Sequence, residues 1–116
     1  MPPASQLPAK GNLFADLPPD SGAEIFHPLF ANPACRIERI ASFGHASPPD
    51  FWYEQDEDEW VVLLAGTACL RFADGGRAEL QAGDWITLPA GRRHRVEAVS
   101  EDALWLAVHC KVAAVK

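Results

Sequence analysis

Turn-forming residues interrupt this chain at short intervals, and their spacing limits the folds that it can adopt. Between Arg36 and Lys111 no apolar pattern continues with the helical period for long enough to make a useful helix. The segments between the turns are short and contain many β-branched and aromatic residues, which is typical of strands. Seven to nine short strands separated by turns predict an all-β sandwich or barrel. The expected strands are residues 24–30, 36–43, 60–64, 67–72, 77–80, 84–88, 94–99 and 103–111.

Two of these segments carry further information about their place in a sheet. Every residue of Trp60–Leu64 is apolar, which is the pattern of a strand buried on both faces. Residues 24–30 contain Pro28, which has no amide proton to donate to a neighbouring strand. We therefore expect the first segment at the centre of the fold and the second at an edge or a bulge.

The N-terminal region differs in composition from the rest of the chain. Residues 1–22 are rich in Pro, Ser, Gly and Asp, and prolines stand at positions 2, 3, 8, 18 and 19. Such a segment cannot maintain a regular element for long. We interpret residues 1–22 as an irregular arm and residues 23–116 as one β-barrel domain. Within the arm, residues 12–17 are expected to form one helical turn whose Leu13, Phe14 and Leu17 pack onto the domain.

The segment Gly83–His94, GDWITLPAGRRH, predicts a strand, a rigid turn and a histidine at the start of the next strand. Gly83 suits a tight turn, and Pro89-Ala90-Gly91 ends the strand and redirects the backbone. This arrangement would direct the imidazole of His94 to a fixed point. Without further information His94 could equally be a partly exposed polar residue at a strand start.

The spacing of Gly83, Pro89, Gly91 and His94 resembles the second motif of the cupin family, G-x5-P-x-G-x2-H-x3-N, with Ala98 at the final Asn position. The first cupin motif, G-x5-H-x-H-x3,4-E-x6-G, is matched by Glu59 and Gly66 in its second half only. The two His positions fall on Tyr53 and Gln55, or with the longer spacer on Trp52 and Glu54. The resemblance covers roughly residues 36–110. It implies a cupin-type double-stranded β-helix, also called a jelly-roll barrel, with an irregular N-terminal arm.

The resemblance also implies a site, because cupins hold a metal inside one end of the barrel with His residues and one Glu. The matching positions here are Tyr53, Gln55, Glu59 and His94. Tyr53, Gln55 and Glu59 have the same parity, so on one extended strand they would point to the same side. We predict Gln55, Glu59 and His94 as ligands of a weak divalent metal of the Zn, Fe, Mn or Ni type. Tyr53 is placed at the rim of the pocket, and His109 is a further candidate for contact with the ligand.

Each of these candidates also has a purely structural interpretation. Glu59 ends a run of five acidic residues among six, Glu54–Glu59, and such runs usually form solvated turns. His109 shares one side of its expected strand with Trp105 and Ala107, and there it could be a hydrogen-bonded core residue. Tyr53 must lose a proton to bind a metal well, which favours a role as a pocket wall.

Composition excludes several classes of function. The formal net charge is −6, and the basic residues cluster only around Arg92–Arg95, so nucleic acid is not expected as a partner. The first ten residues lack the apolar core of a signal peptide, and no apolar run approaches membrane-spanning length. Cys35, Cys69 and Cys110 are widely spaced and odd in number, and we interpret them as free buried thiols in the cytoplasm.

Two classes of function remain after these exclusions. One is a module that binds a small molecule in the barrel pocket, with or without a weak metal centre. The other is a metal-dependent enzyme of the dioxygenase, isomerase or lyase type that acts on a small organic substrate. The missing His pair favours binding, whereas Glu59 and His94 keep the enzyme alternative open. We also expect a homodimer that forms through outer strands, with apolar surface from the last strand and from Leu13, Phe14 and Phe30.

Overall fold

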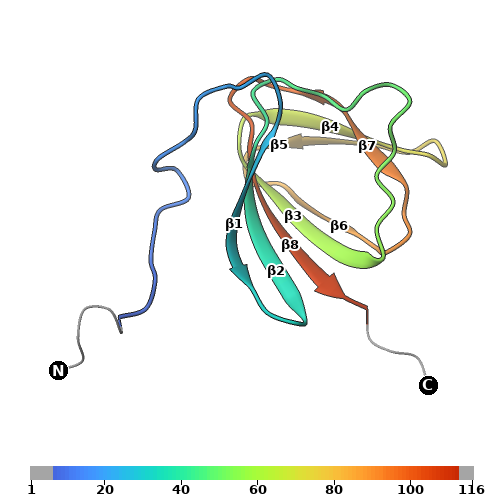
Figure 1. Cartoon of the computed structure of the whole chain (residues 1–116). Coiled ribbons are helices and arrows are strands. Elements are labelled where there is room, and N and C mark those ends of the chain that lie inside the picture. The colour runs from blue at the N-terminus through green and yellow to red at the C-terminus, as the bar shows by residue number, and fades with distance from the viewer. Residues whose placement is uncertain (1–6, 113–116) are drawn as a thin grey trace.

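The computed structural model describes residues 7–112 and consists of eight strands in two antiparallel sheets. One sheet has five strands in the order β1-β2-β8-β3-β6, and the other has three in the order β5-β4-β7. Figure 1 shows the two sheets facing each other around a common interior. The predicted all-β jelly-roll barrel is confirmed. The strands are β1 (Ile25–Ala31), β2 (Cys35–Ala41), β3 (Glu57–Ala65), β4 (Thr67–Phe72), β5 (Arg77–Gln81), β6 (Trp85–Leu88), β7 (His94–Val99) and β8 (Leu104–Lys111).

Local sequence accounts for where the strands begin and end. The turn Asp74-Gly75-Gly76 joins β4 to β5, and Gly75 adopts a φ of 105°, which a residue with a side chain rarely reaches. The pairing of β1 with β2 shifts register between Pro28 and Phe30, and β1 is an edge strand. The sequence prediction of an edge or bulge at Pro28 is therefore confirmed. Within residues 7–112 no helix has the length and apolar character needed to cross a membrane.

The hydrophobic core lies between the sheets and takes one side of each strand. On β3 the inward side chains Val61 and Leu63 are 4% and 0% exposed. The outward side chains of the same strand are less well covered, and Trp60 is 37% exposed. The expectation that Trp60–Leu64 is buried on both faces is therefore wrong for the outward face. An apolar composition alone does not distinguish a two-sided burial from an apolar outer surface.

The outer surface of the five-stranded sheet carries a pair of exposed tryptophans. Trp60 and Trp85 have ring centroids 6.1 Å apart and are 37% and 61% exposed. Since a tryptophan contributes about 150–250 Å² of surface, the pair leaves roughly 200 Å² of apolar area in contact with water. That is about a quarter of what one partner contributes to an interface of ordinary size, ~800 Å². We propose this face as the contact of the homodimer that the sequence led us to expect. Phe14 and Phe30 are exposed as well, but Phe30 lies on β1, at the opposite edge of the five-stranded sheet from Trp85.

The substitution Trp85→Glu tests this contact. A charge at the centre of an apolar interface is strongly unfavourable, so the variant should be a monomer. Sedimentation equilibrium at tens of micromolar should give twice the chain mass of 12.6 kDa for the original protein and a single chain mass for the variant. Phe51→Ser, which alters an exposed aromatic residue elsewhere, should leave the dimer intact. A single chain mass for the original protein would remove the proposed contact.

The arm is anchored to the barrel through its backbone rather than through apolar side chains. Residues 12–17 form a turn in which the Ala15 N–H donates to the Asn12 carbonyl at 3.1 Å, and they do not form a helix. Phe14 and Leu17 are 58% and 50% exposed, so their predicted packing onto the domain is wrong. The guanidinium of Arg39, a residue only 4% exposed, donates to the carbonyls of Leu13, Ala15 and Asp16 at 3.1, 2.7 and 3.3 Å. The arm thus supplies hydrogen-bond acceptors that a buried charge on β2 requires.

Truncation should separate these two parts of the arm. Removal of residues 1–10 leaves the acceptors of Arg39 in place and should change the free energy of unfolding little. Removal of residues 1–17 deletes all three carbonyls and should lower the free energy of unfolding by about 1–3 kcal/mol. Urea denaturation of the two truncated chains measures the difference. Equal stability of the two would show that solvent replaces the arm without loss.

Candidate functional site

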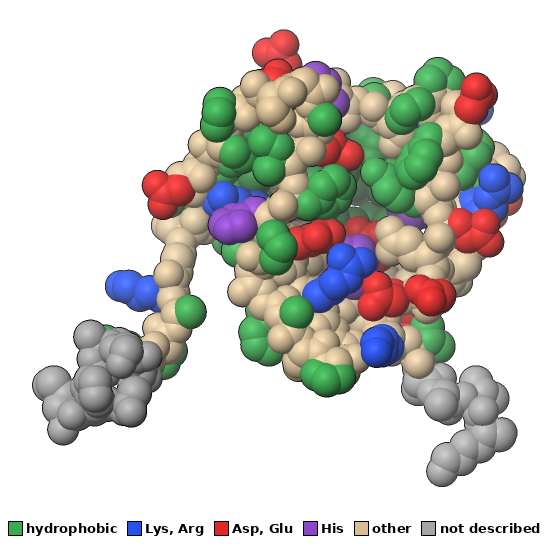
Figure 2. Space-filling model, viewed as in Figure 1, with side chains coloured by type: hydrophobic (Ala, Val, Ile, Leu, Met, Phe, Trp, Pro, Cys, Tyr) green, Lys and Arg blue, Asp and Glu red, His purple; other side chains and the backbone are tan. Residues whose placement is uncertain are grey.

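A cavity of about 70 Å³ lies between the two sheets and opens at one end of the barrel. Figure 2 shows this end hollowed, with carboxylate and imidazole groups at the edge of the hollow. Its walls combine apolar core side chains with a small number of ionisable and amide groups. The lining residues are Glu24, Phe26, Glu38, Ile40, Tyr53, Gln55, Glu59, Val61, Leu70, Leu88, His94, Val96, Trp105 and His109.

All five residues that the sequence analysis selected line this cavity. The backbone that carries two of them, Tyr53 and Gln55, differs from the one expected. Tyr53 and Gln55 do not lie on one extended strand with Glu59, because β3 begins at Glu57. Tyr53 instead pairs with His94 of β7 through two backbone hydrogen bonds, of 2.7 and 3.1 Å. Gln55 is held by its carbonyl, which accepts from the Gly91 N–H at 2.7 Å. The loop before β3 is thus fastened to the turn that precedes β7.

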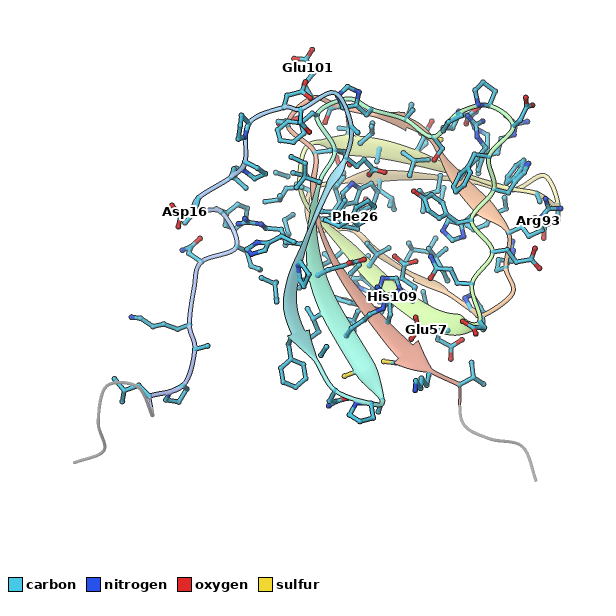
Figure 3. All side chains as sticks on the ribbon, viewed as in Figure 1. Asp16, Phe26, Glu57, Arg93, Glu101 and His109 are labelled. Atoms are coloured by element: carbon cyan, nitrogen blue, oxygen red, sulfur yellow. The ribbon has the colours of Figure 1, made fainter. Side chains whose placement is uncertain are left out.

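Strand register places Glu59 and His109 side by side. The two residues are direct partners across β3 and β8, on the inward side together with Val61, Trp105 and Ala107. His109 points from β8 toward the space between the sheets (Figure 3). Glu59 is 8% exposed and His109 is 3% exposed. The interpretation of Glu59 as part of a solvated turn is therefore wrong.

The imidazole of His94 is fixed in one orientation with a free lone pair. Its Nδ1 lies 3.0 Å from the carbonyl oxygen of Arg92, so Nδ1 carries the proton and donates. Stacking on the Tyr53 ring, with centroids 5.5 Å apart, holds the ring plane. Burial lowers the pKa of His94, against the opposing effect of the bond to Arg92. The ring is neutral at pH 7, and Nε2 is an acceptor.

The imidazole of His109 is also held by one hydrogen bond, but here Nε2 donates and Nδ1 has the free lone pair. Its Nε2 lies 3.1 Å from Oε1 of Glu38 on β2 and donates to it. Burial is the main cause that lowers the pKa of His109, with a smaller contribution from the positive charge of Arg36, and these outweigh the opposing effect of Glu38. The neutral ring leaves Nδ1 as an acceptor, and this atom is buried with no hydrogen-bond partner among the described residues.

The carboxyl group of Glu59 has an unusual acidity for its residue type. Burial raises its pKa to about 7, and the negative charge of Glu38 adds to this while Arg36 opposes it. No protein group in the described part of the chain donates a hydrogen bond to it. At neutral pH the group therefore exchanges a proton readily, and strongly perturbed groups of this kind are concentrated at functional sites.

Tyr53 and Glu24 also line the cavity, and both side chains are half-buried. Burial raises the pKa of Tyr53 to about 12, and the nearby charges of Glu24 and Glu59 contribute. The phenol is therefore protonated at neutral pH, so it acts as a donor and wall rather than as a metal ligand. Glu24 accepts a hydrogen bond from Ser42 at 2.9 Å, and Ser42 accepts one from the indole of Trp105 at 2.9 Å. Burial raises the pKa of Glu24 as well.

The donor set of the cavity fits a metal only in part. His94 offers the tautomer found in metal-bound histidines, with the second nitrogen bonded to a carbonyl. The Oε1 atom of Gln55 is buried without a hydrogen-bond partner, as an unused ligand would be. Across residues 7–112, however, no three His, Cys, Asp or Glu side chains come together in an arrangement that holds an ion. The cavity therefore lacks the cluster of strong ligands that a tightly bound metal needs.

Two acidic residues of the cavity were not found from the sequence. Glu38 lies on the same side of β2 as the inward Ile40, but Ile37 is apolar and lies on the other side. The pattern therefore did not decide which side of β2 faces the interior. Glu24 precedes β1 and belongs to no periodic pattern. Conversely, the Ala98 that replaces the motif Asn is exposed and pairs with Cys69 outside the cavity. Its substitution removes no polar group from the site.

A comparison with protein-family models matches residues 43–109 to the cupin domain. This match covers more than half of the chain. The chain belongs to the cupin family. A comparison with curated proteins gave no match.

Solved structures support the assignment to the cupin family. A protein of Ralstonia eutropha JMP134 with a proposed assignment as mannose-6-phosphate isomerase is 44% identical, with a TM-score of 0.85 over 90% of this chain and 100% of that chain. A cupin superfamily protein of Desulfitobacterium hafniense DCB-2 is 18% identical, with a TM-score of 0.70 over 83% and 84%. An RmlC-like cupin from Desulfovibrio desulfuricans is 16% identical, with a TM-score of 0.73 over 90% and 97%. The last two share the fold alone.

Proposed function

We propose that this cupin binds a small polar organic molecule in the barrel cavity through donors on the ligand. The observation that carries the proposal is a pair of buried acceptors without protein donors, Nδ1 of His109 and Oε1 of Gln55. They line the same cavity as Glu59, a residue 8% exposed. Buried acceptors left without a partner are costly, about 1–3 kcal/mol each, and a bound ligand would remove that cost. Apolar walls with a few converging polar groups are the usual form of a ligand site.

The size and charge of the cavity limit the ligand. Its volume of about 70 Å³ is well below the ~300–1,000 Å³ of sites for drug-sized molecules, so the ligand has few non-hydrogen atoms. Three glutamates line the cavity and no lysine or arginine does. A phosphate group usually requires such cations or a cluster of backbone N–H groups. These features argue against transferring a phosphosugar substrate from the Ralstonia relative.

A weak divalent-metal centre is the alternative, with Gln55, Glu59 and Nε2 of His94 as ligands. It is favoured by the fixed tautomer of His94 and by the free Oε1 of Gln55. A bound Zn, Fe, Mn or Ni ion would act as a Lewis acid toward a carbonyl or hydroxyl of the substrate. In that case Tyr53 would position the substrate in the cavity, and the protein would be an enzyme of the dioxygenase, isomerase or lyase type.

Metal analysis separates the two proposals. Protein purified without a chelator should contain far less than one equivalent of any transition metal, because a neutral amide is a poor ligand. His94→Ala should then change nothing in the metal content. A stoichiometric metal that is lost in His94→Ala and kept in Asp56→Ala would establish the metal centre instead.

Binding itself is tested by filling the cavity. Val61 lines it and is 4% exposed, whereas Val62 is the next residue on the opposite side of β3. Small alcohols, amides and amines should shift the indole NMR resonance of Trp105, which borders the cavity. Val61→Phe should abolish these shifts and Val62→Phe should retain them. Shifts that survive in folded Val61→Phe would place the binding elsewhere.

We further propose a cytoplasmic protein that does not bind nucleic acid. The three cysteines are unpaired thiols, which supports a reducing compartment, and the net charge of −6 repels a phosphate backbone.

A further inference from the structure

We propose that the ligand of the cavity is a small organic ammonium ion, an inference that rests on the proposed binding function. The first observation is the charge of the lining, which includes Glu24, Glu38 and Glu59 but no lysine or arginine. Both lining histidines are directed as acceptors, as described above. The cavity therefore holds an excess of negative charge in an apolar surrounding, and a cation is the complement that such a site lacks.

Arg36, the cation paired with Glu38, does not supply that complement. Arg36 lies 3.7 Å from Glu38 and 3.2 Å from Glu57, and its side chain is 45% exposed. Its charge is thus shared between one residue of the cavity and one outside it. Glu59 and Glu24 have no lysine or arginine within ion-pair distance among the described residues. These two carboxylates are the ones that a ligand cation would meet.

The unpartnered acceptors match the donors of an ammonium group. A primary ammonium carries three N–H donors and no acceptor. Nδ1 of His109, a residue 3% exposed, and Oε1 of Gln55 are acceptors without donors, and Glu59 has no donor either. The aromatic side chains of Phe26, Tyr53 and Trp105 line the same space. A small carboxylate would instead meet like charges, and an alcohol would satisfy acceptors without neutralising charge.

A matched set of three probes tests the ligand class. n-Propylammonium, n-propanol and propionate have the same length and differ in charge, and each is titrated into the full chain at about pH 7.5 and constant ionic strength. NMR shifts of the Trp105 indole report occupancy. Propylammonium should saturate the site at a concentration at least about tenfold lower than propanol, and propionate should not bind. This follows because a hydrogen bond to a charged group contributes more than a neutral one.

Variants locate the source of the preference. Glu59→Gln keeps the shape and removes the charge, so the affinity for propylammonium should fall about tenfold or more and that for propanol should not. Asp56→Asn changes an exposed residue of the same acidic run and should leave both unchanged. If propanol binds as well as propylammonium, or propionate binds best, the ammonium assignment is overturned while the cavity remains a binding site. If no probe binds, the proposed function fails with it.

Cys35 and Cys110 carry an independent inference on the outer side of the five-stranded sheet. They are direct register partners across β2 and β8, and they are half-buried and exposed respectively. The expectation of three buried thiols is therefore wrong for this pair, and only Cys69 is buried. The N–H of Lys111 donates to the carbonyl of Ala34 at 2.9 Å, so the next pair, Cys35 and Cys110, occupies a non-hydrogen-bonded position.

We infer that this pair forms a disulfide when the protein meets an oxidised thiol compound. Partners at non-hydrogen-bonded positions have Cα atoms about 4.5 Å apart, within the range of roughly 4.4–6.8 Å that a disulfide spans. The thiolate of exposed Cys110 attacks oxidised glutathione, whose S–S bond breaks and releases one glutathione thiolate. The thiolate of Cys35 then attacks the sulfur of Cys110 and releases the second glutathione. Each cysteine loses its proton to solvent, and glutathione disulfide is reduced.

Intact mass spectrometry after treatment with oxidised glutathione tests this step. The protein should lose two hydrogen atoms and regain them with a reductant. Cys69→Ser should behave in the same way, whereas Cys35→Ser should stop at the glutathione adduct on Cys110. A persistent adduct on the original protein, or no reaction, would overturn the inference.

Discussion

Gly66→Ala is expected to destabilise the protein by roughly 2–5 kcal/mol, as the sum of backbone strain and overpacking. Gly66 joins β3 to β4 and has a φ of 82°, a conformation that strains any residue with a side chain. A Cβ atom at this position would lie 2.8 Å from Cα of Ala103 and 2.8 Å from Oδ1 of Asp102, and it would also collide with Oγ of Ser100. Ala103 Cα belongs to the backbone and cannot move without moving the turn before β8.

Hydrogen bonds hold that turn close to Gly66, so the turn cannot move away from an added methyl group without a loss of free energy. Oγ of Ser100 accepts from the Thr67 N–H at 2.9 Å and donates to Oδ1 of Asp102 at 2.7 Å. The Ser100 N–H donates in turn to the carbonyl of Thr67 at 2.9 Å. Moving the turn to admit a methyl group would break bonds on both sides.

Gly83→Ala is the matched control for this prediction. Gly83 has a φ of 95°, and a Cβ there would meet no atom within 4 Å. The free energy of unfolding of Gly83→Ala should therefore fall only by the backbone strain, about 1–2 kcal/mol. Urea denaturation of the two variants compares them directly, with refolding from urea where Gly66→Ala does not express as a folded protein. Equal losses would show that the close approach at Gly66 has no energetic consequence.

The parts of the fold that sequence predicts well are those set by local chemistry. Turn residues mark every strand boundary from β4 to β8 to within one or two positions, because these turns need particular φ values or lack donors. The same reasoning failed at Trp60, whose outward exposure depends on what covers the sheet. The burial of Arg39 could not be predicted locally, because the carbonyls that accept its hydrogen bonds lie more than twenty positions away in the sequence.

The candidate site shows the same division. His94 could be placed because a turn and a strand start fix it locally, and His109 because it alternates with Trp105 and Ala107. Glu38 could not be placed, since its side of β2 is decided only by register against β8. The tautomers and the unpartnered acceptors follow from contacts between strands distant in sequence. The five residues chosen from the sequence line one cavity, whereas the charge balance of that cavity could be found only from the structure.

Glu59→Gln is expected to stabilise the protein at alkaline pH and to have no such effect at acidic pH. Burial raises the pKa of Glu59 from 4.5 to about 7 in the folded state. Between these values the folded protein binds more protons than the unfolded chain, so the free energy of unfolding falls as pH rises. Below about pH 4.5 both states are protonated and there is no penalty, and above about pH 7 the penalty is complete. A difference of about 2.5 pKa units corresponds to about 3 kcal/mol.

Urea denaturation across pH, with a chelator present so that no ion contributes, measures this effect. At about pH 8 the Gln variant should exceed the original protein by about 3 kcal/mol, and at about pH 4 the two should agree. The lowered pKa values of His94 and His109 have the opposite effect on stability, which falls as the pH drops through and below the ordinary histidine pKa. This effect is common to both proteins and cancels in their difference.

Asp56→Asn, at an exposed site, should follow the original protein at every pH. A constant difference between Glu59→Gln and the original would mean that Glu59 does not titrate with a raised pKa. A difference that is absent at about pH 4 and grows toward about pH 8 would show that the fold retains a destabilising carboxylate in the cavity, which a bound cation is able to offset.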